Sequence, residues 1–469
     1  MDTATIGAIA TPFGYGGIGI IRISGPKAFP FGASIFRRRN HAGNPVPGLD
    51  ETIFPFESHK LYYGLCIDPQ TVRVIDEILI TFMRSPATYT REDVVEIHAH
   101  GGPCVLQSIM EIALQAGIRP AEPGEFTKRA FLNGRIDLTQ AEAVIDVISA
   151  TSQNALQLAA AQMQGQVRSA VEKIRDQLLA LQTTTEAIID FPEETDEIPL
   201  LTQTQRRQLS RIVADLSDLI QQYHQYHFFR EGIRITIVGA PNVGKSSLMN
   251  RLLQKERAIV TDIPGTTRDL IEDSFLVEGI PIIITDTAGI QNTNDPIEQI
   301  GIMRARQQVS TADLVLFVTD AQRPLGFDGE RHFLESLQDQ KAVIVINKID
   351  LVPALLPLAM PPGSSIPVVG VSALTGAGID ELKRLMLPAC LKERPETDHP
   401  FAPNQRHAAA LLNCRDACNA ILSQDPSSLE PELVAVDLRD AIRHIDGILG
   451  VQIENDILDR IFSNFCIGK

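Results

Sequence analysis

One motif constrains this chain more than any other feature. It is a glycine-rich loop with the pattern G-x-x-x-x-G-K-S, which runs from Gly239 to Ser246. An apolar run at 233–238 that is typical of a strand precedes it, and a helical pattern at 247–253 follows it. In that context the loop N–H groups wrap phosphates, Lys245 reaches the β- and γ-phosphates, and the Ser246 hydroxyl ligates Mg²⁺. The loop therefore predicts a nucleoside triphosphate site.

The segments around this loop predict the architecture. Apolar runs at 282–285, 314–319, 343–346 and 368–371 alternate with helical patterns, which favours a Ras-like P-loop domain with a doubly wound, mostly parallel sheet. Helical patterns lie on both sides of it, so we expect one discontinuous helical domain that carries an inserted GTPase domain. Residues 1–133 read as an α+β domain. The predicted division of this multidomain α/β chain is 1–133, 134–230, 231–390 and 391–469. Thr139 followed by Glu142 predicts a capping box at the start of a helix.

A second motif predicts the base. Asn347-Lys348-x-Asp350 follows a strand directly. The Asp350 carboxylate accepts two hydrogens, which suits guanine N1–H and N2–H₂, whereas adenine offers no such donor pair. Asn347 is suited to guanine N7, and the stem of Lys348 covers the base. The run Ser372-Ala373-Leu374 follows the next strand and is expected to give a backbone N–H to guanine O6.

The motifs between these two predict how GTP is hydrolysed. Asp286 opens D-T-A-G and is expected near a Mg²⁺ water, while Gly289 senses the γ-phosphate and Thr267 is a Mg²⁺ ligand in the switch. An isoleucine occupies the place of the glutamine that orients water in Ras-like enzymes. Glu298 is the candidate replacement, and the alternative is a surface helix glutamate. Spacing also suggests that Asn242 and a switch loop hold a monovalent cation in place of an arginine finger.

Composition limits the remaining functions. The formal net charge is −16, so binding to a nucleic-acid backbone needs either a local basic patch or a partner that supplies the positive charge. The six cysteines are scattered, which favours a reducing compartment rather than a disulfide framework or a zinc site. The N-terminal sequence does not resemble a secretory signal, and no apolar run reaches the ~18 residues of a membrane span. We expect a cytoplasmic protein with no membrane partner.

The motifs together resemble the tRNA modification GTPase family MnmE, also called TrmE, over nearly the whole chain. The phosphate and base motifs are shared by many GTPases, but the terminal run from Phe465 to Lys469, which contains Cys466, is far more specific. The other stretches that carry the resemblance are T-D-I-x-G-T-T-R-D from Thr261, Ala10-Thr-Pro12, His100-Gly-Gly-Pro103, Pro123-Gly-Glu-Phe126 and Arg129-Ala-Phe-Leu-Asn133.

The resemblance implies a potassium-activated GTPase domain that dimerises across its switch faces. Asn242, Thr266 and the carbonyls of Thr261 and Ile263 would hold K⁺, and Glu298 would orient the attacking water. Besides Mg²⁺ ligands Ser246 and Thr267, the expected GTP-binding residues are Asn242, Val243, Gly244, Lys245, Ser246, Ser247, Thr261, Asp262, Ile263, Pro264, Gly265, Thr266, Thr267, Asp286, Thr287, Ala288, Gly289, Asn347, Lys348, Asp350, Ser372, Ala373 and Leu374.

The resemblance also implies a folate site in the N-terminal domain, which would serve dimerisation as well. Arg22, Glu96 and Arg135 would hold 5-formyl- or 5,10-methylene-tetrahydrofolate, and the alternative for each is a structural ion pair. Cys466 would act in catalysis from an untethered chain end. The alternating His98 and His100 lack a third ligand, which favours structural roles.

The implied function is tRNA modification. With an FAD-containing MnmG-type partner in a heterotetramer, a homodimer of the chain would place a carboxymethylaminomethyl or aminomethyl group on C5 of a wobble uridine. The partner would carry most of the tRNA contact. Two alternatives stay open on the sequence: a ribosome-assembly or other regulatory RNA-associated GTPase, for which we find no basic RNA-binding block, and a stand-alone folate enzyme with a regulatory GTPase domain.

Overall fold

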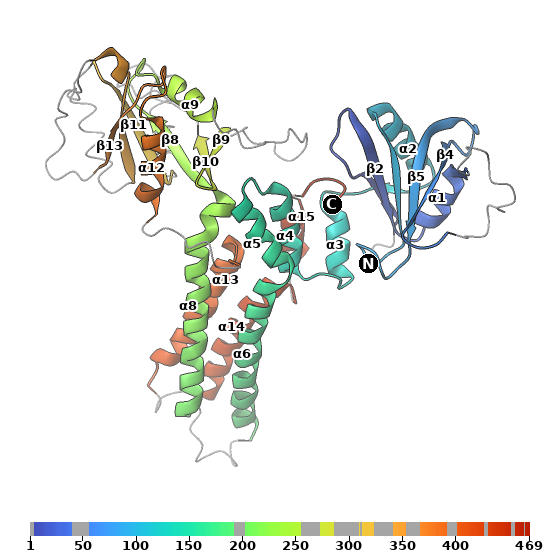
Figure 1. Cartoon of the computed structure of the whole chain (residues 1–469). Coiled ribbons are helices and arrows are strands. Elements are labelled where there is room, and N and C mark those ends of the chain that lie inside the picture. The colour runs from blue at the N-terminus through green and yellow to red at the C-terminus, as the bar shows by residue number, and fades with distance from the viewer. Residues whose placement is uncertain are drawn as a thin grey trace, which may run out of the picture.

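The computed structural model describes residues 4–39, 56–191, 202–254, 273–285, 309, 312–322, 341–352, 366–391, 401–425, 430–451, 455–463 and 465–469. Three bodies are visible in Figure 1: an N-terminal α/β unit, a bundle of long helices, and a second α/β unit. The second unit lies in the chain between helices α8 (Gln203–Glu231) and α13 (Gln405–Ser423), so the helical domain is interrupted as predicted. The four residue ranges predicted for the domains stay predictions.

The N-terminal unit is one sheet with helices on one face. Its strand order is β3-β4-β5-β6-β2-β1-β7, with bounds Phe36–Arg38, Lys60–Ile67, Val74–Met83, Val94–Gly101, Gly16–Ser24, Ile6–Ile9 and Arg119–Pro120. Helices α1 (Ala28–Ile35) and α2 (Pro103–Gln115) cover one face, where Ile21 and Ile23 are fully buried. Side chains alternate along a strand, so Arg22 projects from the opposite face.

The helical body joins two distant parts of the chain. Helices α6 (Gln166–Asp190), α8, α13 and α14 (Pro431–Leu449) share one apolar core, to which Leu178, Leu216 and Leu438 contribute. Cys414 and Cys418, one helical turn apart on α13, are fully buried in this core. The shorter helices are α3 (Glu125–Leu132), α4 (Leu138–Ser149), α5 (Gln153–Met163) and α15 (Asn455–Phe462).

The cap of α4 differs from the sequence prediction. The capping box is formed by Asp137 and Gln140, two residues before the expected pair, and Thr139 donates its hydroxyl to Asp137. Glu142 instead turns into the protein, where it is 8 % exposed and pairs with Arg406 from α13. The expected pair was wrong because Glu142 has a long-range cation partner, which a local pattern does not reveal.

The second α/β unit has the predicted sheet. Its strand order is β13-β12-β11-β8-β10-β9, with bounds Val368–Gly370, Ala342–Asn347, Leu314–Asp320, Ile233–Val238, Ile280–Thr285 and Asp273–Val277. The described pairs are parallel except β9 with β10. Helices α9 (Lys245–Gln254) and α12 (Ile379–Cys390) accompany the sheet. This is the doubly wound topology, which places the ends of parallel strands at one edge.

Helices α5 and α8 pack into the core of this unit. Helix α8 runs to Gly232, whose φ of 74° turns the chain into β8, and a Cβ there would lie 2.9 Å from the carbonyl oxygen of Pro281. Leu158 of α5 and Phe229 of α8 belong to the apolar cluster of the sheet. Among the described residues, no helix combines the length and apolar character needed to cross a membrane.

Candidate functional site

The phosphate loop has the backbone shape that its glycines allow. Gly239 and Gly244 have φ values of +151° and +93°, and a Cβ on Gly239 would lie 2.1 Å from the carbonyl oxygen of Val318. Asn242 also has a positive φ, 63°. Lys245 Nζ donates to the carbonyl oxygens of Gly239 (3.0 Å) and Ala240 (2.9 Å). The lysine thus lies across the loop at the start of α9, where helix N–H groups favour an anion.

Lys245 is partly desolvated in this position. Burial lowers the pKa of its ammonium group. A phosphate group beside it would restore a favourable partner for the positive charge, because an opposite charge at close range stabilises the ionised form. The loop is therefore built for an anion rather than for a neutral ligand.

The base motif is tied directly to the phosphate loop. Asn347, at the end of β12, is 2 % exposed; its Nδ2 donates to the Val243 carbonyl (2.9 Å) and its Oδ1 accepts from Ala373 N–H (3.0 Å). Lys348, with φ 65°, donates from Nζ to the Asn242 carbonyl (2.8 Å). The side chains of Asn347 and Lys348 therefore join three loops at the same edge of the sheet.

Asp320 is a site residue that the sequence reasoning missed. Its Oδ2 lies 2.7 Å from Lys348 Nζ, and it pairs in register with Asn347 in the neighbouring strand. The available signal was its place at the carboxyl end of β11, one residue after the predicted strand. This carboxylate neutralises the Lys348 ammonium and fixes the stem that is expected to cover the base.

The third loop is Ser372–Leu374. Ser372 is fully buried, and its Oγ accepts from Thr375 N–H (3.1 Å) while its carbonyl accepts from Gly376 N–H (2.8 Å). Asp350 lies in the short 3₁₀ turn η1 (Ile349–Leu351), and its side chain is exposed. The exposed carboxylate is free to receive a base from solvent, whereas the buried Ser372 sets the shape of the loop.

The predicted switch residues lie outside the described residues. These are the two segments 261–267 and 286–289, together with Glu298. Their roles, and the K⁺ site that combines them with Asn242, stay predictions.

A Gly244→Ala variant tests whether the two motifs act as one unit. A Cβ at Gly244 would lie 2.3 Å from Asn347 Nδ2 on a backbone with φ +93°. Strain of about 1–3 kcal/mol should weaken GDP affinity roughly tenfold or more, measured by fluorescence titration of the full chain. The matched control is Gly447→Ala in α14, where a Cβ meets no atom within 4 Å. Equal affinity of Gly244→Ala and the control would contradict the prediction.

The three predicted folate residues lie together on the side of the N-terminal sheet opposite α1 and α2. Arg22 and Glu96 are paired across β2 and β6, and Arg22 Nε donates to Glu96 Oε1 (2.7 Å). The guanidinium carbons of Arg22 and Arg135 lie 5.9 Å and 4.6 Å from the ring centroid of Tyr89. The cluster thus combines a carboxylate, two cations and an aromatic face.

His98 is a second residue whose place the sequence did not indicate. Its Nε2 lies 3.7 Å from Glu96 Oε2 and is buried without a hydrogen-bond partner among the described residues. A buried polar atom without a partner costs free energy, so this group fits a ligand with a polar edge at Glu96. His100, in contrast, lies 2.7 Å from Asp76 at the surface, which agrees with a structural role.

The C-terminal tail reaches the same cluster and is not untethered as expected. Figure 1 shows the C-terminus beside α3. Arg22 Nη1 donates to the Gly468 carbonyl (3.3 Å), and the Cys466 carbonyl accepts from Gly124 N–H (3.4 Å). Phe465 is buried against Phe462, with ring centroids 5.3 Å apart. These contacts hold the tail because its aromatic residue has an apolar pocket, and they place Cys466 beside the cluster.

The Cys466 thiol is half-buried in this position. Burial raises its pKa, and the nearby positive charge of Lys469 opposes that rise. The thiol is therefore mostly protonated at neutral pH, so the protein around it does not by itself generate a thiolate.

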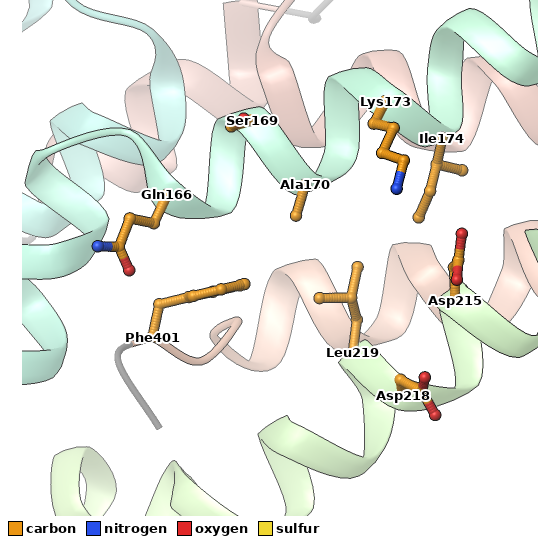
Figure 2. A pocket seen from close by; sticks show the side chains of 9 residues that line it. All are labelled: Gln166, Ser169, Ala170, Lys173, Ile174, Asp215, Asp218, Leu219 and Phe401. Atoms are coloured by element: carbon orange, nitrogen blue, oxygen red, sulfur yellow. The ribbon is translucent and has the colours of Figure 1, made fainter. Parts of the chain in front are cut away.

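The helical bundle holds a cavity that belongs to neither cluster. It has a volume of about 540 Å³ and lies between α6 and α8. Figure 2 shows Lys173 of α6 opposite Leu219 and Asp215 of α8, with the ring of Phe401 at one side. None of the residues predicted for GTP or folate lines it.

The fold and the linked motifs define the class of protein: a P-loop protein of the guanine-nucleotide-binding type. Two family descriptions match the chain, "GTP-binding protein TrmE N-terminus" over residues 5–135 and "MnmE helical domain" over residues 138–466. Proteins named tRNA modification GTPase MnmE are similar over the full length. Those of Natranaerobius thermophilus and Moorella thermoacetica are 40 % and 42 % identical and cover 100 % and 99 % of both chains.

A third relative from Syntrophotalea carbinolica, with the same name, is 43 % identical over 99 % of both chains. Identity at this level along the whole length, with a match to both family descriptions, decides the assignment. The chain belongs to the tRNA modification GTPase MnmE family.

Proposed function

We propose that this chain is a potassium-activated GTP hydrolase that acts in the modification of tRNA in the cytoplasm. The observation that carries the proposal is the direct connection between the phosphate loop and the base motif, through Asn347 to Val243 and Lys348 to Asn242. Family membership adds the reaction context, since the relatives are named tRNA modification GTPases.

Each nucleotide contact follows from the chemistry of its residue. Lys245 would neutralise the β- and γ-phosphates, and Ser246 and Thr267 would hold Mg²⁺ beside them. Asp350 accepts the guanine donors. K⁺ held by Asn242, Thr266 and the carbonyls of Thr261 and Ile263 would stabilise charge in the transition state, while Glu298 orients water.

The N-terminal cluster fits a folate. Glu96 suits the donor edge of a pterin, and the cations of Arg22 and Arg135 suit its polar and carboxylate groups. The unpartnered His98 Nε2 beside Glu96 supports a polar ligand there. When bound, a one-carbon tetrahydrofolate supplies the carbon for C5 of the wobble uridine.

Cys466 lies beside this cluster, which supports a role on the substrate. We further propose that the chain works as a homodimer with an FAD-containing MnmG-type partner, that the product carries a carboxymethylaminomethyl or aminomethyl group, and that the partner makes most of the tRNA contact. The formal charge of −16 supports this last division.

The test is GTP hydrolysis in K⁺ against Na⁺ at equal ionic strength. We expect the wild type to be at least about tenfold faster in K⁺, because a preorganised cation stabilises the transition state. Asn242→Ala should lose that preference, while Asn413→Ala, at an exposed position in α13, should keep it. Glu298→Ala should lose most of the rate in both salts with GTP binding intact. Equal wild-type rates in K⁺ and Na⁺ would overturn the potassium proposal.

A further inference from the structure

Arg251 links the phosphate-binding helix to the base loop. It lies six residues after Lys245 on α9, and its Nη2 donates to the Leu374 carbonyl (2.8 Å). A Cβ on Gly376 would lie 3.1 Å from Nη2 and 3.3 Å from Cζ and Nε of this arginine. The guanidinium group therefore packs against the backbone of Gly376, whose φ of +88° is open to glycine.

The tip of this loop is held through its backbone. Leu374 is 81 % exposed, so its side chain does not anchor the loop. On the preceding side, Ala373 N–H donates to Asn347 Oδ1. The peptide groups around Leu374 are thus held between Asn347 on one side and Arg251 on the other.

This arrangement positions the donors for the base. The backbone N–H groups of the loop are expected to meet guanine O6, and the bond from Arg251 fixes the Leu374 carbonyl beside them. We infer that Arg251 is a positioning residue for guanine recognition, which holds the Leu374 carbonyl so that the neighbouring backbone N–H groups meet O6. The inference rests on the proposed GTP site and deepens it.

The chemistry of Arg251 favours this role over a contribution to stability. Its Nε is buried without a hydrogen-bond partner among the described residues. An unpaired buried N–H costs free energy, so the side chain is a poor way to stabilise the fold alone. The planar guanidinium group nevertheless donates to the Leu374 carbonyl and at the same time packs against the backbone of Gly376. A lysine ammonium group cannot make both contacts.

The test compares GDP with 6-thio-GDP, in which sulfur replaces O6 but N1–H and N2–H₂ are kept. Affinities are measured by calorimetry on the full chain. The wild type should prefer GDP, and Arg251→Ala should lower GDP affinity about five- to tenfold while 6-thio-GDP affinity changes little. The GDP affinity of Arg251→Lys should lie between those of the wild type and Arg251→Ala. Arg384→Ala is the matched control. Arg384 is an exposed arginine of α12, and its Nε donates to the Asp380 carbonyl of the same helix.

The outcomes separate the inference from the proposed function. If the wild type prefers GDP and both Arg251 variants keep the same preference, the positioning role is wrong and the GTP site stands. If Arg251→Ala binds GDP and 6-thio-GDP more weakly by the same factor, Arg251 supports nucleotide binding in general rather than recognition of O6. That result overturns the inference as well. If the wild type binds neither ligand, the GTP site itself is wrong. Should Arg251→Ala not fold, the Arg251→Lys ratio decides.

Discussion

An Asp350→Asn variant is expected to exchange guanine for xanthine. Xanthine presents an oxygen at C2 where guanine presents an amino group, so an amide at position 350 can donate to it. Guanine would instead meet an amide donor with its own N2–H₂ donor. A site built around a hydrogen bond rejects the mismatched base strongly, on the order of 10⁴-fold in binding. Competition between GTP and XTP for the full chain measures this exchange.

The substitution should change base recognition without moving residue 350, because backbone and neighbouring contacts hold this position rather than the Asp350 side chain. Lys348 is held by Asn242 and Asp320, and η1 begins directly after it. Asp350 itself is exposed, so an amide of the same size fits there without repacking. Asp380→Asn, an exposed aspartate at the start of α12, is the control and should leave both affinities unchanged. Continued preference for GTP in Asp350→Asn would place guanine recognition elsewhere.

The sequence was informative wherever local pattern decides the structure. Each predicted strand of the P-loop domain is present within a residue or two, because buried parallel strands read as apolar runs. The order of the phosphate and base motifs along the chain also placed them at one edge of the sheet. Doubly wound topology brings those strand ends together without any further information.

The sequence was uninformative where a partner lies far away in the chain. Asp320 holds Lys348 across neighbouring strands, and the Gly468 carbonyl reaches Arg22 from the other end of the chain. Nothing in a local pattern distinguishes these from solvated groups. The same holds for Glu142, whose pattern suggested a helix cap while its partner is more than two hundred positions away.

Removal of Arg406 is expected to destabilise the helical body strongly. Glu142 of α4 is buried, and Arg406 Nε and Nη2 donate to its two carboxylate oxygens (2.6 and 3.0 Å). Arg406 also donates to the carbonyls of Gly447 (2.7 Å) and Ile448 (3.2 Å) at the end of α14. It therefore joins the N-terminal part of the bundle to both C-terminal helices.

An Arg406→Met variant leaves the Glu142 carboxylate buried without its cation. Breaking a buried pair in this way costs about 3–5 kcal/mol, because the carboxylate stays away from water and keeps only His407 and Asn404 as partners. Urea unfolding followed by helical circular dichroism measures the loss. Arg443→Met is the matched control: Arg443 pairs with Asp440 in solvent and is 72 % exposed, so its loss should be at most about 1 kcal/mol. Adding Glu142→Gln to Arg406→Met should restore part of the stability.

The same network predicts a pH dependence. Burial lowers the pKa of His407, whose Nε2 lies 2.7 Å from Glu142, so the unfolded chain binds this proton more readily below pH 6.5. Burial alone would raise the pKa of Glu142, but His407 and Arg406 outweigh it and hold this pKa below the ordinary 4.5. Both groups therefore favour the unfolded chain as the pH falls, first below 6.5 and then below 4.5.

The Arg406→Met variant changes both parts of this dependence, because Arg406 lowers the pKa of His407 as well as that of Glu142. Burial raises the pKa of Glu142, and His407 still opposes that rise, but the contribution of Arg406 is lost, so this pKa lies higher than in the wild type and the stabilising contribution of Glu142 above pH 4.5 becomes smaller. The free energy of unfolding should then fall less steeply between pH 5 and pH 3 than in the wild type, and the fall near pH 6.5 should become smaller, because Arg406 no longer repels the protonated His407. Parallel curves for the two proteins would show that Arg406 does not hold the charge of Glu142, and the bundle would then owe its junction to apolar packing alone.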